Sequence, residues 1–411
     1  MSRLWDVAVV GAGPAGNRAA ELFARRGATV LLLDPKAPWE KPCGGRLTAA
    51  ALQHTPELQE LHAASQAIHE VLVTAPSGAS VVIPLRHPYQ VVSRLTLSQW
   101  GLERAKAAGA CFQSLAVQSA KRTNEGWSIV DSAGDTHRAR RIIAADGAAS
   151  RLRGLLAPQL RPELAPARVA YPRVGAPPGR AVFVFLPSVQ GYLWDFPRLG
   201  HHSVGVGVPP GTFQRAPLDE AIAQYRLAEA GDSEPTEYRG AVIATSMWIS
   251  GSFADLGGRD HALLGDAAGL ADPATGEGMD YALRSASLAA EVYDEQLGFE
   301  RYPAAAQAAF GAETRRARVI RRWLYRRGVA EWLVTGARRS PRVTLLLMAL
   351  VDAINEHESL RSAILRGIFA SVPDRQAAQV VCQCPDGCPP CEPVPPPTDT
   401  AVAQGLVEAR R

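Results

Sequence analysis

The feature that most constrains the fold is a glycine triplet between an apolar strand pattern and a helical pattern near the amino end. Gly11, Gly13 and Gly16 form the sequence GAGPAG directly after an apolar run that ends at Val10. In such a turn the first glycine permits a tight bend, the second lets the backbone approach a pyrophosphate, and the third allows close packing of helix on sheet. The pattern therefore predicts a βαβ unit of a Rossmann-like domain that binds a dinucleotide.

The residues around the triplet support this prediction. Pro14 to Arg26 has a helical pattern, and Thr29 to Leu33 is typical of a buried second strand. Asp34 ends that strand and is placed to accept hydrogen bonds from ribose hydroxyls. Backbone N–H groups at the start of the helix favour phosphate charge. A glycine turn used only for packing would leave Asp34 without a role, so we expect a bound dinucleotide.

A second glycine-rich segment, LGDAAGLADPATGEGMDYAL at residues 264–283, indicates which dinucleotide it is. Asp266 follows a predicted strand and is placed to bind ribityl hydroxyls, while Gly276 and Gly278 open a helix predicted to reach Leu297. Free N–H groups at that helix end favour the N1–C2 carbonyl edge of a flavin. GDAAG alone can be a simple turn between strand and helix, but the pair of segments predicts FAD.

The order of strand and helix patterns predicts an α/β chain, α+β overall, with a Rossmann-like FAD-binding domain. This domain is predicted to be discontinuous, because it carries an inserted, mostly antiparallel β-sheet domain for the substrate. Helices and a Pro- and Cys-rich flexible tail follow. The predicted segments are 1–67, 94–166 and 253–302 for the FAD-binding domain, 68–93 and 167–252 for the substrate domain, 303–372 for the helices and 373–411 for the tail.

Composition excludes some classes of function and location. The formal net charge of +4 is small for 411 residues, so we expect no nucleic-acid partner. The longest strongly apolar run, Val343 to Val351, is far shorter than the ~20 residues that span a bilayer. Leu4 to Val10 runs directly into the glycine turn and leaves no room for a signal peptide, so we expect a cytoplasmic location.

Two features of the carboxyl half leave alternatives open. Seven arginines between Arg315 and Arg327 form either a solvated helix face or a surface for peripheral contact with anionic lipids. The four tail cysteines have enough thiols for zinc or an iron–sulfur cluster, but their spacing matches no specific site, and unliganded thiols are the simpler interpretation. These cysteines are Cys382, Cys384, Cys388 and Cys391. We therefore assign no metal ligand.

Three further motifs are more specific: KPCGG at residues 41–45, ADGAASR at 145–151 and YLWDFP at 192–197. With the two glycine-rich segments they resemble, in order along roughly residues 5 to 300, the geranylgeranyl reductase family within the p-hydroxybenzoate-hydroxylase-like flavoproteins. The resemblance implies an FAD-dependent oxidoreductase that reduces C=C bonds of an isoprenoid or similarly apolar substrate. A flavin monooxygenase or halogenase-like enzyme using a flavin hydroperoxide is the alternative, and a flavin-binding protein without turnover is a second.

The resemblance also implies roles for single residues. It places the Cys43 loop beside the flavin, Arg94 in contact with the flavin, and Asp146 and Gly147 near the pyrophosphate and the path of a transient nicotinamide cofactor. From local chemistry alone, a capped glycine turn explains Asp146 and Gly147 equally well. A surface salt bridge is the simpler explanation of Arg94. Arg46 departs from the family, where a small or apolar residue is common, and would pair with flavin phosphate or with an anionic substrate head group.

The aromatic motif and the cysteine have chemical roles that fit an apolar substrate. Tyr192 and Trp194 alternate along a strand and so point to one face, where they would bury an isoprenoid chain. Reduction of an isolated alkene needs close positioning and proton delivery, and Cys43 either donates the proton or shapes the cavity. Ordinary core packing explains each of these residues singly. No second G-x-G-x-x-G unit occurs, so NADPH or reduced ferredoxin is expected as a transient electron donor.

The predicted site has two groups of residues. The catalytic residues are Cys43, Tyr192 and Trp194. The cofactor-binding residues are Gly11, Gly13, Pro14, Ala15, Gly16, Asp34, Pro35, Cys43, Gly44, Gly45, Arg46, Arg94, Asp146, Gly147, Gly265, Asp266, Gly276, Gly278 and Met279.

Overall fold

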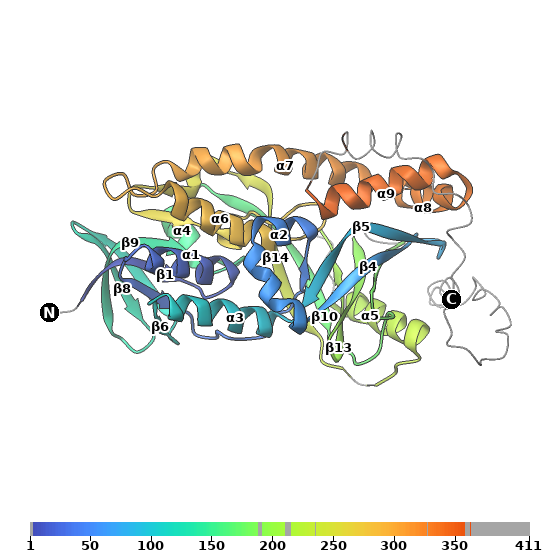
Figure 1. The fold of residues 1–411 in the computed structure, drawn as a ribbon, viewed down its shortest axis with the longest axis horizontal. Helices are drawn as coiled ribbons and strands as arrows, with labels where there is room; N and C mark the ends of the chain where they lie inside the picture. The colour runs from blue at the N-terminus through green and yellow to red at the C-terminus, as the bar shows by residue number, and fades with distance from the viewer. Residues whose placement is uncertain are drawn as a thin grey trace.

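The computed structural model of the chain describes residues 3–187, 191–209, 215–234, 236–326, 328–357 and 362. Two eight-stranded sheets lie side by side, and a row of helices covers both of them (Figure 1). The four tail cysteines lie outside the described residues. The predicted fold class, a Rossmann-like α/β unit with a mostly antiparallel second sheet and following helices, is confirmed.

The first sheet forms around the strand that precedes the glycine triplet. Its strands are β1 (Leu4–Val10), β2 (Val30–Leu33), β6 (Cys111–Gln113), β7 (Val117–Thr123), β8 (Gly126–Asp131), β9 (Thr136–Ala144), β15 (Gly257–Gly258) and β16 (His261–Leu263). β1 pairs in parallel with β2 and β9, and β9 pairs in parallel with β16. Strands from distant parts of the sequence thus lie next to one another, and their fully buried Val, Ile and Leu side chains form one core.

The second sheet is antiparallel except for one parallel pair, β4 with β11. Its strands are β3 (Arg46–Leu47), β4 (Ser65–Thr74), β5 (Ser80–Val92), β10 (Arg161–Ala170), β11 (Arg180–Phe185), β12 (Tyr192–Arg198), β13 (His201–Gly207) and β14 (Arg239–Ser250). The sheet therefore combines a hairpin from the first hundred residues with strands from the middle of the chain. Inside this β-rich region the sequence also forms a helix that we did not predict, α5 (Arg215–Ala230). Leu218, Ile222 and Tyr225 are spaced along one face of α5 and buried in a small core with strands of this sheet.

The remaining helices pack on the two sheets and on one another. They are α1 (Pro14–Arg25), α2 (Ala49–His54), α3 (Arg94–Ala107), α4 (Arg151–Leu156), α6 (Met279–Val292), α7 (Tyr302–Leu324), α8 (Val329–Arg339) and α9 (Pro341–Asn355), with 3₁₀ turns η1 (Pro56–Ala64), η2 (Phe253–Leu256) and η3 (Gly265–Ala268). α6 is shorter than predicted, because the chain leaves the helix at Tyr293 and the Asp294 carboxylate caps a turn by accepting hydrogen bonds from the N–H groups of Gln296 and Leu297.

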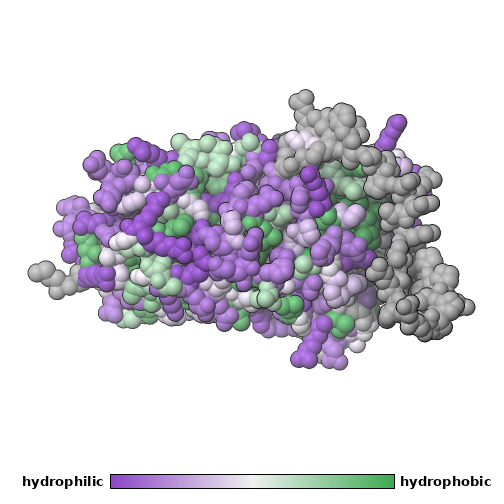
Figure 2. Space-filling model, in the orientation of Figure 1, coloured by the Kyte–Doolittle hydropathy of each residue, from purple (hydrophilic) through white to green (hydrophobic). Residues whose placement is uncertain are grey.

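The long helix α7 runs along both sheets and leads into α8 and α9, which lie over β4 and β5 (Figure 1). Two arginines of its arginine-rich part contact the second sheet: Arg318 Nε donates to the carbonyl of Ser246 at 2.9 Å, and Arg321 lies 2.5 Å from Glu163. On the face seen in Figure 2, apolar side chains occur in small groups among polar ones. Among the described residues, none of the helices is long and apolar enough to cross a membrane.

Candidate functional site

The glycine turn after β1 is packed too tightly for any side chain at its first position. Gly11 has φ +99, and a Cβ there would lie 2.3 Å from the carbonyl oxygen of Ala145. Gly16 is held equally closely, since a Cβ there would lie 1.7 Å from the carbonyl oxygen of Gly11. Gly13, in contrast, has nothing within 4 Å of the position of a Cβ. The first and third glycines therefore serve backbone packing, while the second leaves open space at the start of α1.

Asp34 lies beside this turn at the end of β2. One carboxylate oxygen accepts a hydrogen bond from Ala12 N at 2.8 Å, and the other accepts from Lys36 N at 2.7 Å and Ala37 N at 2.9 Å. Pro35 follows it and is exposed. Pro14 is the first residue of α1, where its missing N–H costs nothing. The backbone therefore holds the acidic side chain next to the glycine turn.

The second glycine-rich segment lies against the first. A Cβ on Gly265 would lie 3.3 Å from that of Ala15. The Asp266 carboxylate forms an ion pair at 3.0 Å with Lys41, the first residue of the KPCGG motif. Gly276 has φ +71, Gly278 precedes the first turn of α6, and Met279 is buried between α6 and the elements packed on it. The two segments, about 250 residues apart, thus form one continuous site.

The Asp146-Gly147 segment lies on the other side of the glycine turn. The Asp146 carboxylate accepts hydrogen bonds from Ser150 Oγ at 2.5 Å and Arg151 N at 2.9 Å, and so caps α4. Gly147 has φ +82, with nothing within 4 Å of a Cβ position. Arg153 on α4 donates to the carbonyl of Ala267 at 3.1 Å and ties this segment to the second glycine-rich one. The structure therefore shows a capping role for Asp146 and open space beside Gly147.

Arg94 begins α3 and is buried, with 8% exposed. Its Nε has no hydrogen-bond partner among the described residues. Its backbone N–H donates to the carboxylate of Glu40 at 3.1 Å, as does that of Leu95 at 2.8 Å. A buried guanidinium nitrogen without a partner is costly unless a bound group supplies an acceptor.

These residues fit FAD. The open space at Gly13 and Gly147 faces helix N-termini and would take the pyrophosphate, Asp34 and Asp266 would bind the adenosine ribose and the ribityl chain, and α6 would present its first N–H groups to the flavin ring. The unpartnered Nε of Arg94 is a further donor for the cofactor. Bound FAD would supply hydride-transfer chemistry to this site.

The cysteine loop is anchored by side chains that the sequence did not single out. The carbonyl of Cys43 accepts hydrogen bonds from Arg198 at 2.6 Å and Ser203 Oγ at 3.0 Å, and its N–H donates to Tyr171 Oη at 3.3 Å. Burial raises the pKa of Tyr171 to about 12. Arg198 also forms an ion pair with Glu40 at 2.7 Å. Burial raises the pKa of the Glu40 carboxyl, but Arg198 and backbone N–H groups outweigh this and lower it below its usual value.

The aromatic side chains of β12 lie directly beneath this loop. A Cβ on Gly44 would lie 2.8 Å from the ring of Phe196 and 3.5 Å from Nε1 of Trp194. The Trp194 Nε1–H donates to Ser203 Oγ at 3.3 Å. Its indole is opposite Gly205 on β13, where a Cβ would lie 2.3 Å from the ring, so the glycine provides room for it. Trp194 is thus a support for the cysteine loop, and it does not line the pocket described next.

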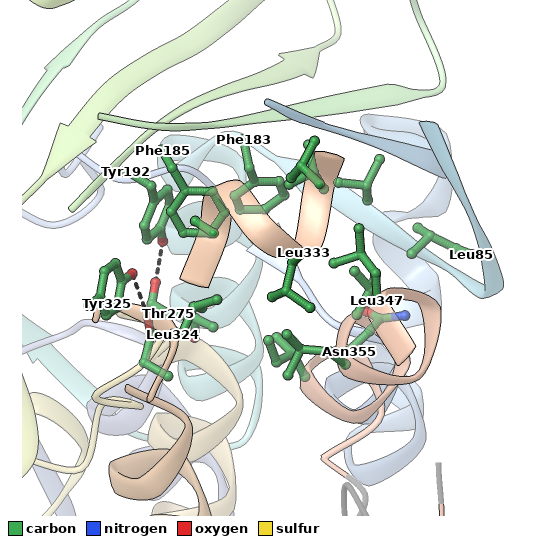
Figure 3. Close-up of a pocket in the computed structure, with 18 of the residues that line it drawn as sticks. Leu85, Phe183, Phe185, Tyr192, Thr275, Leu324, Tyr325, Leu333, Leu347 and Asn355 are labelled. Carbon is green, nitrogen blue, oxygen red and sulfur yellow. Dashed lines mark hydrogen bonds between the residues drawn. The ribbon is translucent and has the colours of Figure 1, made fainter. Parts of the chain in front are cut away.

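An apolar pocket lies between the second sheet and helices α7 to α9, with about 750 Å³ of empty space when the solvent at its open mouth is included (Figure 3). Its sheet wall carries Phe183, Phe185 and Tyr192, and its helix wall carries mostly leucines. Those leucines are Leu324, Leu333, Leu347 and Leu350. Arg46 also lines the pocket and is the cationic residue among the described lining residues. Such a cavity accommodates an apolar chain, because few polar atoms face it.

One end of the pocket reaches the flavin segment. The Tyr192 hydroxyl donates to the carbonyl of Thr275, and the Tyr325 hydroxyl donates to that of Ala274 at 3.0 Å (Figure 3). Both carbonyls immediately precede Gly276. Burial raises the pKa of Tyr192, so its hydroxyl stays protonated and keeps this contact. The two tyrosines therefore join the pocket to the segment that would carry the flavin.

A buried charge cluster holds the end of α9 against α6. His357 is 3.2 Å from Asp280 and 3.6 Å from Glu277, and its ring stacks on Tyr281 with centroids 5.3 Å apart. Burial lowers the pKa of His357, but the two carboxylates outweigh it and raise the pKa to about 10. Burial raises the pKa of Asp280, yet His357 and His54 lower it well below its usual range. The helix that walls the pocket is thus fixed by ion pairs.

Comparison with known proteins identifies relatives of this chain. A family model described as lycopene cyclase protein matches residues 6–165. Digeranylgeranylglycerophospholipid reductase 2 of Methanopyrus kandleri is 32% identical over 315 residues, covering 71% of this chain and 78% of that protein. Menaquinone reductase of Mycolicibacterium smegmatis is 31% identical over 324 residues, covering 70% and 76%. A geranylgeranyl bacteriochlorophyll reductase-like structure from Thermoplasma acidophilum has a TM-score of 0.69 at 22% identity, covering 90% and 97%.

The fold, the glycine-rich site and the sequence relatives together define an FAD-dependent oxidoreductase. The two sequence relatives named above are 32% and 31% identical to this chain, which covers more than two thirds of each of them, and they identify the family within this class. The chain belongs to the geranylgeranyl reductase family of FAD-dependent oxidoreductases.

Proposed function

We propose that the protein saturates C=C bonds of an isoprenoid lipid that enters the apolar pocket. The observation that carries the proposal is the pocket itself, because its aromatic end is hydrogen-bonded to the Ala274-Thr275 turn before the flavin segment. A prenyl chain buried there would exchange water for apolar contacts, worth about 0.8 kcal/mol per CH₂ group. The relatives named above act, by their names, on a digeranylgeranyl glycerophospholipid and on menaquinone.

The residues of the chain supply position and a proton. Phe183 and Tyr192 hold the chain against the sheet wall, and the pocket excludes water from the reacting bond. The Cys43 thiol accepts one weak hydrogen bond from Gly45 N at 3.4 Å, and its own proton is available for transfer. An isolated alkene accepts hydride only as a proton arrives, so we assign proton donation to Cys43. Trp194 positions this residue by packing under the loop.

We also propose a transient electron donor, either NADPH or reduced ferredoxin. The sequence has no second dinucleotide fingerprint that would hold a nicotinamide cofactor permanently. Reduction of the bound FAD under anaerobic conditions by NADPH, compared with dithionite-reduced ferredoxin, distinguishes the two donors.

The test is anaerobic reoxidation of the reduced holoenzyme by a panel of prenyl lipids, followed by mass spectrometry of the product. We expect flavin absorbance to return with at least one panel lipid, together with a product heavier by two hydrogens. Oxygen-dependent hydroxylation of the lipid, without anaerobic reoxidation, would contradict the proposal and indicate a monooxygenase. A flavin that no reductant bleaches would indicate a binding protein without turnover.

A matched control separates the pocket from the flavin site. Leu333 on α8 lines the pocket, is 1% exposed and is not among the predicted cofactor-binding residues. Leu333→Trp fills the pocket, so we expect loss of reoxidation by prenyl lipids with FAD content retained. Gly13→Ala instead changes the cofactor site and leaves the pocket intact, so we expect it to lose FAD.

A further inference from the structure

Two buried hydrogen-bond donors without partners lie together in the wall of the apolar pocket. Arg46 on β3 and Tyr89 on β5 both line it, and they are 9% and 1% exposed. The guanidinium carbon of Arg46 lies 4.9 Å from the centre of the Tyr89 ring. Among the described residues, neither Arg46 Nε nor Tyr89 Oη has a hydrogen-bond partner.

Neither group is explained by the stability of the fold. An unpaired buried hydroxyl or guanidinium N–H costs free energy, typically about 1–3 kcal/mol or more when the group is charged. The contact of Arg46 with the ring of Tyr89 compensates part of the charge but satisfies no N–H group. No described residue forms an ion pair with Arg46. A bound molecule with an oxygen acceptor would satisfy both donors.

The neighbouring polar groups are already occupied. Tyr192, which also lies on the sheet wall, donates a hydrogen bond from its hydroxyl to the Thr275 carbonyl. Asn355, at the helix wall, donates to the carbonyl of His87 at 2.9 Å and accepts from Ala49 N at 3.3 Å. Burial raises the pKa of Tyr89, so its hydroxyl remains protonated and can donate. Arg46 and Tyr89 are therefore the donors in the described pocket wall that are free for a ligand.

We propose that Arg46 and Tyr89 bind one oxygen acceptor of the substrate, a carbonyl or carboxylate that carries at most one negative charge. This inference rests on the proposed function, because it places a polar head group on the prenyl chain that the pocket takes. The limit on charge follows from the lining: Arg46 is the cationic residue of the described pocket wall, and a diphosphate in an apolar cavity needs several cations. A quinone ring and a carboxylic acid are the two sources of such an oxygen.

The position of the two donors also orients the substrate. Arg46 follows Gly45 at the end of the cysteine loop, so the head group would lie near Cys43. The pocket extends from Tyr192 and Tyr325 toward Leu85 and Leu347 (Figure 3). Its apolar far end would hold the remainder of the prenyl chain, and the bond to be reduced would lie close to the head group.

The test measures binding to the oxidised holoenzyme, from the change in flavin absorbance, so that it does not depend on turnover. The probes are a menaquinone with a geranylgeranyl-length side chain, geranylgeranoic acid, geranylgeranyl diphosphate and the matching oxygen-free hydrocarbon. We expect the menaquinone or the acid to bind more tightly than the hydrocarbon and the diphosphate. Arg46→Met should weaken binding of that preferred probe about 10- to 100-fold, and Tyr89→Phe about 2- to 10-fold, with binding of the hydrocarbon unchanged.

A stability measurement separates this role from a structural one. Because the Tyr89 hydroxyl has no partner, Tyr89→Phe should leave the urea midpoint of the protein unchanged or raise it. The inference is overturned if the two substitutions weaken binding of the hydrocarbon as much as binding of the oxygenated probes. It is also overturned if the diphosphate binds most tightly and does so through Arg46. A third contradicting result is that neither the menaquinone nor the acid binds more tightly than the hydrocarbon. Loss of FAD in Arg46→Met would assign Arg46 to the cofactor and overturn it too. Failure of every lipid to reoxidise the reduced flavin would refute the proposed function. The order of the probe affinities tests the head-group site separately.

Discussion

Substitution of the first two fingerprint glycines by alanine separates backbone packing from cofactor approach. At Gly11 the added Cβ meets the carbonyl oxygen of Ala145 at 2.3 Å, and the backbone has φ +99. At Gly13 the backbone has φ −76 and the added Cβ meets nothing within 4 Å. We therefore expect Gly11→Ala to lose both stability and FAD, and Gly13→Ala to lose FAD alone.

The size of the difference follows from these contacts. A non-glycine residue at positive φ costs about 1–2 kcal/mol, and overpacking against a backbone atom that cannot move aside costs about 1–3 kcal/mol. Gly11→Ala should therefore lower the free energy of unfolding by about 2–5 kcal/mol, a large part of the about 5–15 kcal/mol of a typical protein. Gly13 is the N-cap of α1, where replacement of glycine by alanine costs about 1 kcal/mol or less.

Two assays are needed, because bound FAD stabilises the folded state by itself. Urea denaturation of the FAD-free proteins reports the packing effect, and titration of the same proteins with FAD reports the cofactor effect. Wild-type FAD affinity in Gly13→Ala would refute the assignment of open space at Gly13 to the pyrophosphate. Equal urea midpoints for the two variants would refute the packing argument at Gly11.

Three more outcomes are expected. Cys43→Ala should slow anaerobic reoxidation by a prenyl lipid about 100-fold or more at unchanged FAD content, and an unchanged rate would leave Cys43 a role in shape alone. Tyr192→Phe should lower the free energy of unfolding by about 1–3 kcal/mol in urea, because the Thr275 carbonyl loses its donor. His357 has its pKa raised from 6.5 to about 10 in the folded state, so its stabilisation is complete below about pH 6.5 and is lost as pH rises through 10. His357→Gln should be less stable than the wild type at pH 6 and should show less loss of stability between pH 6.5 and 10, and parallel pH profiles would contradict this.

The sequence predicts those parts of the site whose signal is local. Gly11 and Asp34 are separated by one βαβ unit, and the pattern of that unit alone implies that they meet. The motif YLWDFP likewise implies a strand with its aromatic rings on one face. The fold class follows from the same patterns, since they specify a parallel unit, a β-rich region and later helices.

What could not be predicted depends on contacts between distant segments. Arg198 and Tyr171 hold the cysteine loop from positions more than 120 residues away, and no local pattern marks them. Tyr89 lies in a strand whose alternation indicates burial but not an unpartnered hydroxyl. The helix α5 is different, because the spacing of Leu218 and Ile222 is visible in the sequence and was obscured by the β-rich segments around it.

The anchoring of the cysteine loop has a consequence for the whole molecule. Glu40, before the loop, caps α3 beside the first sheet, whereas Arg198 and Ser203 hold the Cys43 carbonyl from the second sheet. Any sliding of one sheet relative to the other is therefore transmitted to the backbone of Cys43. In the proposed reaction, the distance between the Cys43 thiol and the bond to be reduced would therefore depend on how the two sheets are assembled. A fragment that keeps only the Rossmann-like part would retain the glycine fingerprint but would lose the contacts from the second sheet that position Cys43.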